Sequence, residues 1–316
     1  MRRAIVLAAL LVATPAVAAE GHLVVVAGRG GDPQFRDLFH EQAVALASAA
    51  ETRFGLAAEN VYCLTEKPER DPTTIDQRST LENLTSVFEK LTARVRPGDR
   101  VFVVLIGHGS FRSGEGRFNL PGPDLTPSGL ARLLEPLDDQ EVVLVSTASA
   151  SGAFAEPLAG PGRVVVTATK SGQERNQTVF GEHFVTALTT QGADVDKDGR
   201  VSILEAYAYT TREVERFYES ENRLQTEHAR LEDEGQLARR LFLQGEGHGG
   251  AEAETASDDP ALASLYAARR DLEDQIETLR AGKDEIAPES YAEQLETLLL
   301  ELALQNESID AAGGER

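Results

Sequence analysis

Residues 100–106 read Arg-Val-Phe-Val-Val-Leu-Ile and lead directly into Gly107-His108-Gly109-Ser110. A near-continuous apolar run of this length is typical of a strand buried on both faces of a parallel sheet. Similar runs recur along the chain, and segments with helical spacing separate them. The runs are His22–Ala27, Asn60–Leu64, Glu141–Ser146 and Arg163–Ala168, and the helical segments include Gln34–Phe54, Leu81–Val95 and Ser128–Leu134. This alternation predicts an α/β fold, a three-layer sandwich built on a mostly parallel sheet.

The same patterning divides the chain. Two further helical segments follow the last strand, so residues 20–244 are expected to form one α/β domain. Residues 245–260, rich in Gly, Ala and Glu, indicate a linker. Residues 261–310 carry heptad-spaced apolar positions and predict an α-helical hairpin with a coiled-coil seam, packed on itself or used for self-association or for a protein partner. The seam positions are Leu262, Leu265, Leu272, Ile276, Leu279, Tyr291, Leu295, Leu298, Leu302 and Ile309.

The charge of the chain excludes one class of partner. The 316 residues have a formal net charge of −21. A general nucleic-acid-binding protein needs a basic face, so no nucleic-acid partner is expected. The excess is uneven, because residues 246–316 contain 18 acidic and 5 basic residues, a net charge of −13.

The N-terminus predicts export. Arg2 and Arg3 precede the apolar stretch Ala4–Val12, and Ala16-Val17-Ala18 supplies small residues for cleavage, so residues 1–19 are interpreted as a signal peptide. An uncleaved N-terminal anchor is the alternative. No other run is long enough to span a membrane, so no transmembrane segment is expected after signal removal. The mature protein is expected in a bacterial periplasm.

A calcium-binding loop is the strongest local motif. Residues 194–205 read Asp-Val-Asp-Lys-Asp-Gly-Arg-Val-Ser-Ile-Leu-Glu and fit the twelve-residue EF-hand loop. Carboxylates at positions 1, 3, 5 and 12 supply hard oxygen ligands, the glycine at position 6 permits a sharp turn, and positions 7 and 9 add a carbonyl and a hydroxyl. The predicted ligands of one Ca²⁺ are Asp194, Asp196, Asp198, Arg200, Ser202 and Glu205. The alternative is an acidic helix N-terminus.

Two strand ends carry a second constellation. The strand Arg100–Ile106 leads into Gly107-His108-Gly109-Ser110, and the strand Glu141–Ser146 leads into Thr147-Ala148-Ser149-Ala150-Ser151-Gly152. Ligands of open α/β sheets bind at the carboxyl ends of the strands. A histidine and a serine at neighbouring ends are therefore expected to meet, with backbone N–H groups beside them as an oxyanion hole.

These motifs, in this order, resemble the legumain-like cysteine peptidases, family C13 of the caspase-like clan. That family has a strand ending in His-Gly-Ser and a second ending in Glu-Ala-Cys-Glu-Ser-Gly. Val25-Val26-Ala27-Gly28, followed by Phe35-Arg36, resembles the family's first strand and the arginine of its specificity pocket. The resemblance covers residues 23–218 and implies a caspase/legumain-like sandwich that takes a peptide or protein substrate. It implies His108 as general base, Gly109 and Ser149 N–H groups as the oxyanion hole, and Arg36 and Thr147 beside the substrate.

The chain differs from the family at the position of the catalytic nucleophile. The nucleophilic cysteine falls on Ser149, and the only cysteine, Cys63, lies in the second strand and is expected to be a buried core residue. A serine hydroxyl is far less acidic than a thiol and normally needs a base oriented by a carboxylate. No acidic partner for His108 can be identified from the sequence.

Three interpretations therefore stay open. The chain is a peptidase homologue that has lost activity and binds or scaffolds, a working Ser/His hydrolase, or a fold in which Ala148–Gly152 is only a tight turn. A non-enzymatic periplasmic scaffold acting through the C-terminal hairpin is the rival function. Two further stretches are given structural interpretations: Gly28-Arg29-Gly30-Gly31 as a turn into the first helix, and Thr226-Glu227-His228, with Glu232 and Asp233, as a solvated helix end.

Overall fold

A computed structural model describes residues 19–190, 192–195, 199–243 and 288–312, together with 264, 265, 268, 269, 272, 275, 276 and 279. The expected signal peptide and linker therefore lie outside the described residues, apart from Ala19. Among the described residues, no helix combines the length and apolarity that a membrane span requires.

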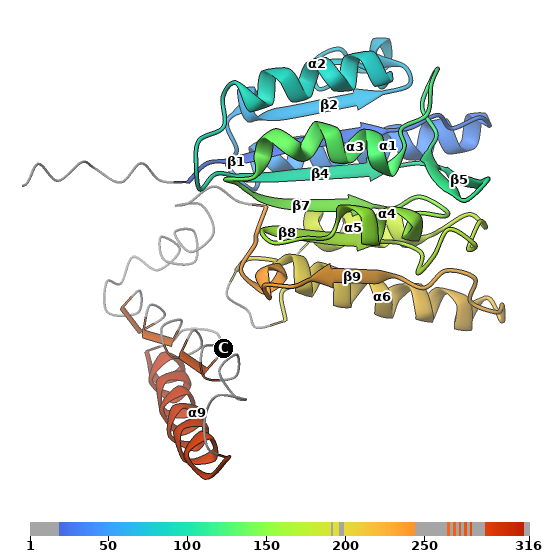
Figure 1. Ribbon diagram of the computed structural model, residues 1–316. Coiled ribbons are helices and arrows are strands. Elements are labelled where there is room, and N and C mark those ends of the chain that lie inside the picture. The colour runs from blue at the N-terminus through green and yellow to red at the C-terminus, as the bar shows by residue number, and fades with distance from the viewer. Residues whose placement is uncertain are drawn as a thin grey trace, which may run out of the picture.

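The main domain is built on a seven-stranded sheet with the order β3-β2-β1-β4-β7-β8-β9 (Figure 1). All neighbouring strands are parallel except β9, which runs antiparallel to β8. A separate hairpin pairs β5 with β6. The strands are β1 Gly21–Ala27, β2 Val61–Thr65, β3 Gln77–Arg78, β4 Arg100–Ile106, β5 Gly109–Arg112, β6 Glu115–Phe118, β7 Glu141–Ser146, β8 Arg163–Thr167 and β9 Arg230–Asp233. The mostly parallel sheet predicted from the apolar runs is confirmed.

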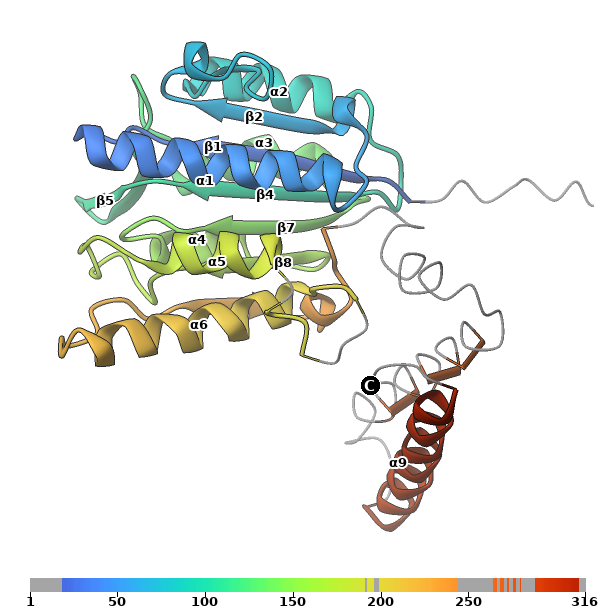
Figure 2. The same cartoon turned by 180° about the vertical axis from the view of Figure 1, so that it is seen from behind.

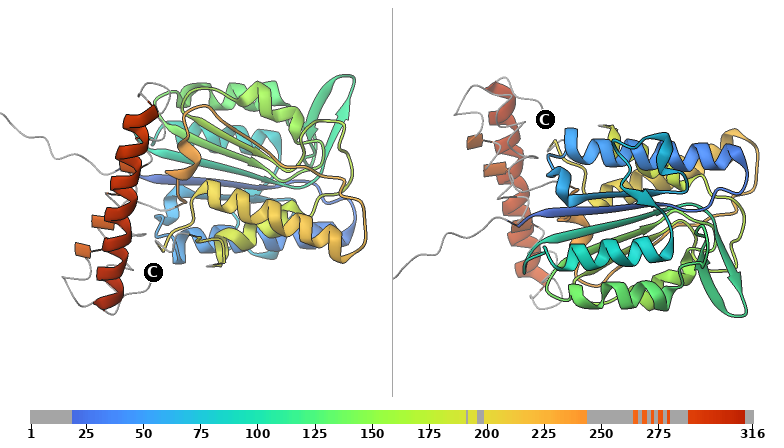
Figure 3. Two further views of the ribbon diagram at one scale, coloured as in Figure 1. Left: turned by 90° about the horizontal axis from the view of Figure 1, so that it is seen from below. Right: turned by 90° about the horizontal axis from the view of Figure 1, so that it is seen from above.

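Helices cover both faces of this sheet and complete three layers (Figures 1 to 3). Alternate residues of β1 point into two separate cores: Leu23 and Val25 pack with one set of helices, and Val24 and Val26 with the other. The first set is α1 Pro33–Thr52, α5 Phe180–Thr189 and α6 Ile203–Ser220. The second is α2 Leu81–Thr92, α3 Pro127–Leu134 and α4 Gly152–Leu158. The predicted three-layer α/β sandwich is therefore confirmed.

Local capping explains where most of these helices begin. Side-chain oxygens of Asp32, Thr80, Thr126 and Ser202 accept from backbone N–H groups in the first turns of α1, α2, α3 and α6. At α6 the cap is reciprocal, because Glu205 also accepts from the N–H of Ser202. Helix α5 has no such cap, since its N-cap residue is Val179.

The segment after α6 differs from the expectation. The interpretation of residues 226–233 as a solvated helix end is wrong, because Arg230–Asp233 forms the antiparallel edge strand β9 and Glu227 is only 1% exposed. Both Glu227 oxygens accept from the start of α5, from the N–H of Val179 at 2.8 Å and of Phe180 at 3.2 Å. This carboxylate therefore supplies from a distance the cap that α5 lacks.

A helical hairpin follows at the C-terminal end. Helix α9 spans Pro288–Ala311, and the described residues between 264 and 279 are also helical. The Gln305 side chain donates a hydrogen bond to the backbone oxygen of Leu265 at 2.6 Å, which joins the two arms. The described seam positions are all buried or half-buried, whereas Leu299, Leu300 and Leu304 are exposed. The hairpin prediction is confirmed; Leu262 lies outside the described residues.

Candidate functional site

The carboxyl ends of β4 and β7 bring the two predicted motifs together. Leu105 pairs with Ser146 in the parallel ladder, and the Thr147 N–H donates to the backbone oxygen of Leu105 at 2.9 Å. Residues 107–109 and 147–149 consequently emerge at one edge of the sheet. The sequence expectation that these segments meet therefore agrees with the geometry.

The Ser149 hydroxyl is bound to backbone and not to the histidine. Its Oγ accepts from the N–H of Gly109 and donates to the carbonyl of Gly109, both at 3.1 Å. The residue is 4% exposed. The contact depends on glycine, because a Cβ at position 109 would lie 2.1 Å from the backbone oxygen of Ser149. The same bonds occupy the Gly109 N–H that the resemblance assigns to the oxyanion hole.

His108 is held by aromatic packing. Its ring meets Phe35 and Phe39 edge-on at centroid distances of 4.8 and 4.9 Å. Within the described part of the chain, no hydrogen bond joins its imidazole to Ser149 or to a carboxylate. Burial lowers the pKa of the His108 imidazole, and no carboxylate acts to raise it. The ring is therefore neutral at physiological pH and lacks the acidic partner that orients a catalytic base.

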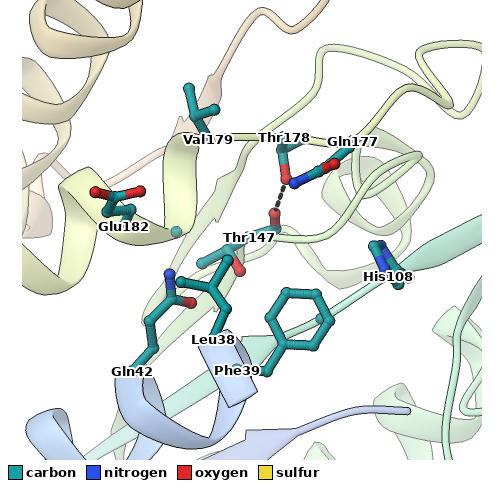
Figure 4. A pocket seen from close by; sticks show the side chains of 11 residues that line it. Leu38, Phe39, Gln42, His108, Thr147, Gln177, Thr178, Val179 and Glu182 are labelled. Atoms are coloured by element: carbon teal, nitrogen blue, oxygen red, sulfur yellow. Dashed lines mark hydrogen bonds between the residues drawn. The ribbon is translucent and has the colours of Figure 1, made fainter. Parts of the chain in front are cut away.

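Thr147 shares a small cavity with His108 (Figure 4). The cavity holds about 40 Å³, and Phe39, Gln42, Thr178 and Glu182 also line it. The Thr178 hydroxyl donates to the backbone oxygen of Thr147 at 2.6 Å. This bond joins the loop through Thr178, which lines the cavity, to the end of β7. This space fits a small group such as one water or a methyl group.

Arg36 lies elsewhere. Its Nε donates to Glu66 Oε2 at 3.2 Å, and it lines a separate cavity of about 10 Å³. The expected substrate-binding arginine is thus paired with a carboxylate and does not line the cavity that holds His108 and Thr147. Sequence reasoning could not identify Glu66, because 30 residues separate it from Arg36.

A larger cavity lies at the carboxyl ends of β1 and β4, between the segments that follow these two strands. It measures about 580 Å³ and is called here the arginine cavity. Its lining residues are Arg29, Gly30, Gly31, His108, Ser110, Arg112, Ser113, Arg117, Asn119 and Asp124. The basic turn Gly28-Arg29-Gly30-Gly31, predicted only as a turn into the first helix, is the sequence signal for this cavity.

The EF-hand-like loop keeps several features of its motif. Gly199 has a φ of +81° and donates its N–H to Asp194 Oδ2 at 3.0 Å. Glu205 reaches back across the loop to accept from the Val195 N–H at 2.9 Å. Carboxylates from the first and last positions of the loop thus both bind its backbone, and such oxygen donors suit a hard cation such as Ca²⁺.

The remaining predicted ligands have mixed outcomes. Ser202 caps α6 and also donates its hydroxyl to Glu205, and the Arg200 guanidinium lies 4.2 Å from the centre of the Phe242 ring. Asp196 and Asp198 lie outside the described residues. No cluster of three or more candidate metal ligands is found among the described residues.

Cys63 is not available as a nucleophile. It is fully buried in β2, and burial raises the pKa of its thiol to about 12. A thiol of that acidity carries almost no thiolate at neutral pH. The prediction of a buried core cysteine is therefore confirmed.

No family model matches the chain, and no curated protein is similar to it in sequence. Among solved structures, the chain is similar to a crystal structure of a protein from Geobacter sulfurreducens, with 12% sequence identity and a TM-score of 0.49. The match covers 72% of this chain and 99% of that chain. Any functional assignment must therefore come from the chain's own residues.

Proposed function

We propose that the chain is an exported, legumain-like pseudopeptidase that binds peptide segments without cleaving them. The hydrogen bonding of Ser149 is the observation that carries the proposal. To act as a nucleophile, its hydroxyl would have to leave both backbone partners at Gly109 and turn toward His108. Burial lowers the basicity of the His108 imidazole and no carboxylate assists it, so the ring offers little to offset that loss.

The rest of the site is suited to holding a chain. His108, Thr147 and the loop through Thr178 surround the small cavity, and the arginine cavity adjoins the same histidine. Ligands of open parallel sheets bind at the edge formed by the carboxyl ends of the strands. The chain leaves β1 for α1 on one face of the sheet and leaves β4 for α3 on the other. A peptide side chain in one cavity and its neighbour in the other would make the binding selective without any bond being broken.

Calcium is part of the proposal as a structural ion. Asp194, Glu205 and the predicted ligands Asp196, Asp198, Arg200 and Ser202 would hold one Ca²⁺ through oxygen atoms. The ion would neutralise the acidic loop and fix the start of α6 against the sheet. Export to a bacterial periplasm, by way of the signal peptide at residues 1–19, places the protein where free calcium is accessible.

A turnover assay on the purified mature protein tests the proposal. Wild type, Ser149→Ala and Ser149→Cys are compared on peptide and ester libraries, and binding of the same peptides is followed by fluorescence anisotropy. Peptide binding with turnover equal to that of Ser149→Ala is expected from wild type. Turnover that disappears in Ser149→Ala would overturn the pseudopeptidase assignment in favour of a serine hydrolase. Cleavage gained in Ser149→Cys would support descent from a cysteine peptidase.

One observation favours a second candidate, a scaffold that acts through its hairpin. Leu299, Leu300 and Leu304 are 44%, 57% and 59% exposed on α9, outside the seam. Exposed apolar groups on one helix are a common element of protein interfaces. Deleting residues 245–316 and measuring the oligomeric state tests self-association: an unchanged monomer before and after deletion excludes it.

A further inference from the structure

We infer that the arginine cavity receives an acidic side chain of the bound peptide. The inference rests on the proposed function, since it specifies which peptides that site takes. The cavity lies between the segments after β1 and β4, where the strand order reverses from β2-β1 to β4-β7. Open α/β sheets bind their ligands at this reversal. Its volume of about 580 Å³ is within the range of natural small-ligand sites.

The charges of the cavity select the ligand. Neither Arg29 nor Arg112 has a side-chain hydrogen bond or ion pair within the described part of the chain, although both line the cavity. Arg117 is bound on one side only: its Nη2 lies 2.8 Å from Glu115 Oε2, whereas its Nε is buried without a hydrogen-bond partner among the described residues. Among the described residues, Asp124 is the only carboxylate that lines the cavity. The balance is positive in a protein that is strongly negative overall.

Arg29 and Arg112 therefore offer the cavity guanidinium N–H groups that have no side-chain partner among the described residues. A carboxylate suits this position, because two of its oxygens match two parallel N–H groups of one guanidinium. Asn119 adds a neutral donor: its Oδ1 faces the Ser110 hydroxyl at 3.3 Å, which leaves its amide N–H groups for the ligand. An acidic side chain would therefore replace the missing partners.

The backbone of the same loop argues against a phosphate-binding site. Such sites present free N–H groups to the ligand. Here the Gly28 N–H donates to Ile106, the Arg29 N–H to Asn119, and the Gly30 N–H to Glu66 Oε2 at 3.1 Å. These three N–H groups of the loop are therefore not available to an anion. The net charge of −21 also disfavours approach of a polyanion such as nucleic acid.

The test uses fluorescent peptide libraries in which one position is fixed as Glu, Asp, Gln or Asn, with binding followed by anisotropy on the full mature chain. Wild type is expected to bind the acidic libraries roughly tenfold to a hundredfold more tightly than the amide libraries, with a preference that weakens as salt is added. Arg112→Gln and Arg29→Gln should each reduce this preference. Arg132→Gln, which removes an exposed arginine on α3, is the matched control and should keep it.

The outcomes separate the two proposals. Equal binding of acidic and amide libraries would overturn the inference and leave the peptide-binding function standing. Failure of every library to bind would overturn the peptide-binding function itself. Displacement of the acidic library by equimolar inorganic phosphate would reassign the cavity to a free oxyanion. Loss of preference in Arg112→Gln with unchanged binding of the amide libraries is the result that supports the cavity as the acidic subsite.

Discussion

Replacing Glu227 by alanine should reduce the free energy of unfolding by roughly 2–6 kcal/mol. The change removes the acceptor for the N–H groups of Val179 and Phe180, at the uncapped start of α5. Each buried donor left without a partner costs about 1–3 kcal/mol. The Tyr218 hydroxyl adds little, because it keeps a second partner in Thr226 at 3.0 Å. A negative charge also leaves the positive end of the helix dipole.

The isosteric variant Glu227→Gln removes the carboxylate charge and keeps one of the two oxygens that accept from Val179 and Phe180. Burial raises the pKa of the Glu227 carboxyl above its usual value, although the N–H donors act in the opposite direction. A raised pKa in the folded state gives stability that is complete below the unfolded pKa, near 4.5, and is lost as the pH rises through the folded pKa. The advantage of wild type over Glu227→Gln should therefore shrink as the pH rises above about 4.5.

Urea unfolding followed by far-ultraviolet circular dichroism suits this measurement, because the chain contains no tryptophan. Hydrogen exchange at Val179 and Phe180 reports the same bonds locally and should accelerate in Glu227→Ala. A loss below about 1 kcal/mol, with unchanged exchange at both amides, would refute the reasoning. Because Val179 and Thr178 line the small cavity, Glu227→Ala should also weaken peptide binding.

Three further predictions concern the rest of the chain. Burial lowers the pKa of four imidazoles, those of His22, His40, His108 and His183. Their contribution to stability is complete above the unfolded pKa of 6.5 and is lost as the pH falls through the folded pKa. The melting temperature should therefore fall as the pH drops below 6.5. Chelation of calcium should lower the melting temperature of wild type but not of Glu205→Gln, which keeps one of the two oxygens that accept from Val195 and Ser202 and loses a bidentate ligand. Cys63 should react with a thiol reagent only at the rate of unfolding, and rapid labelling of the folded protein would contradict its burial.

Most of the sandwich could be predicted because its strands are long, apolar and buried on both faces. Each of the five predicted strands is present within a residue or two of its expected bounds. The missed elements lack that signal. Strand β9 is a half-buried edge of four residues with two acidic side chains, and its pairing with β8 is decided by a contact between distant segments. The same distance hides the Glu227 cap, which acts across 47 residues.

The candidate site shows the same division between local and distant causes. Sequence placed His108 and Ser149 at adjacent strand ends, because parallel strands leave their carboxyl ends at one edge. The hydrogen-bond partner of the Ser149 hydroxyl could not be predicted from the sequence. That partner is Gly109, whose position at the start of β5 depends on its pairing with Phe118.

Phe118 in turn fixes the backbone of Gly109, which the hydroxyl binds. Its ring is fully buried and covers Gly28 and Gly107, where a Cβ would lie 2.9 and 3.1 Å from the ring. Moving Gly109 away from Ser149 would pull this ring from the core, at a cost of several kcal/mol. The burial of one phenylalanine thus holds the backbone that binds the serine. The packing that forms the sheet edge therefore also sets the hydrogen bonds on which the proposed loss of nucleophilic chemistry rests.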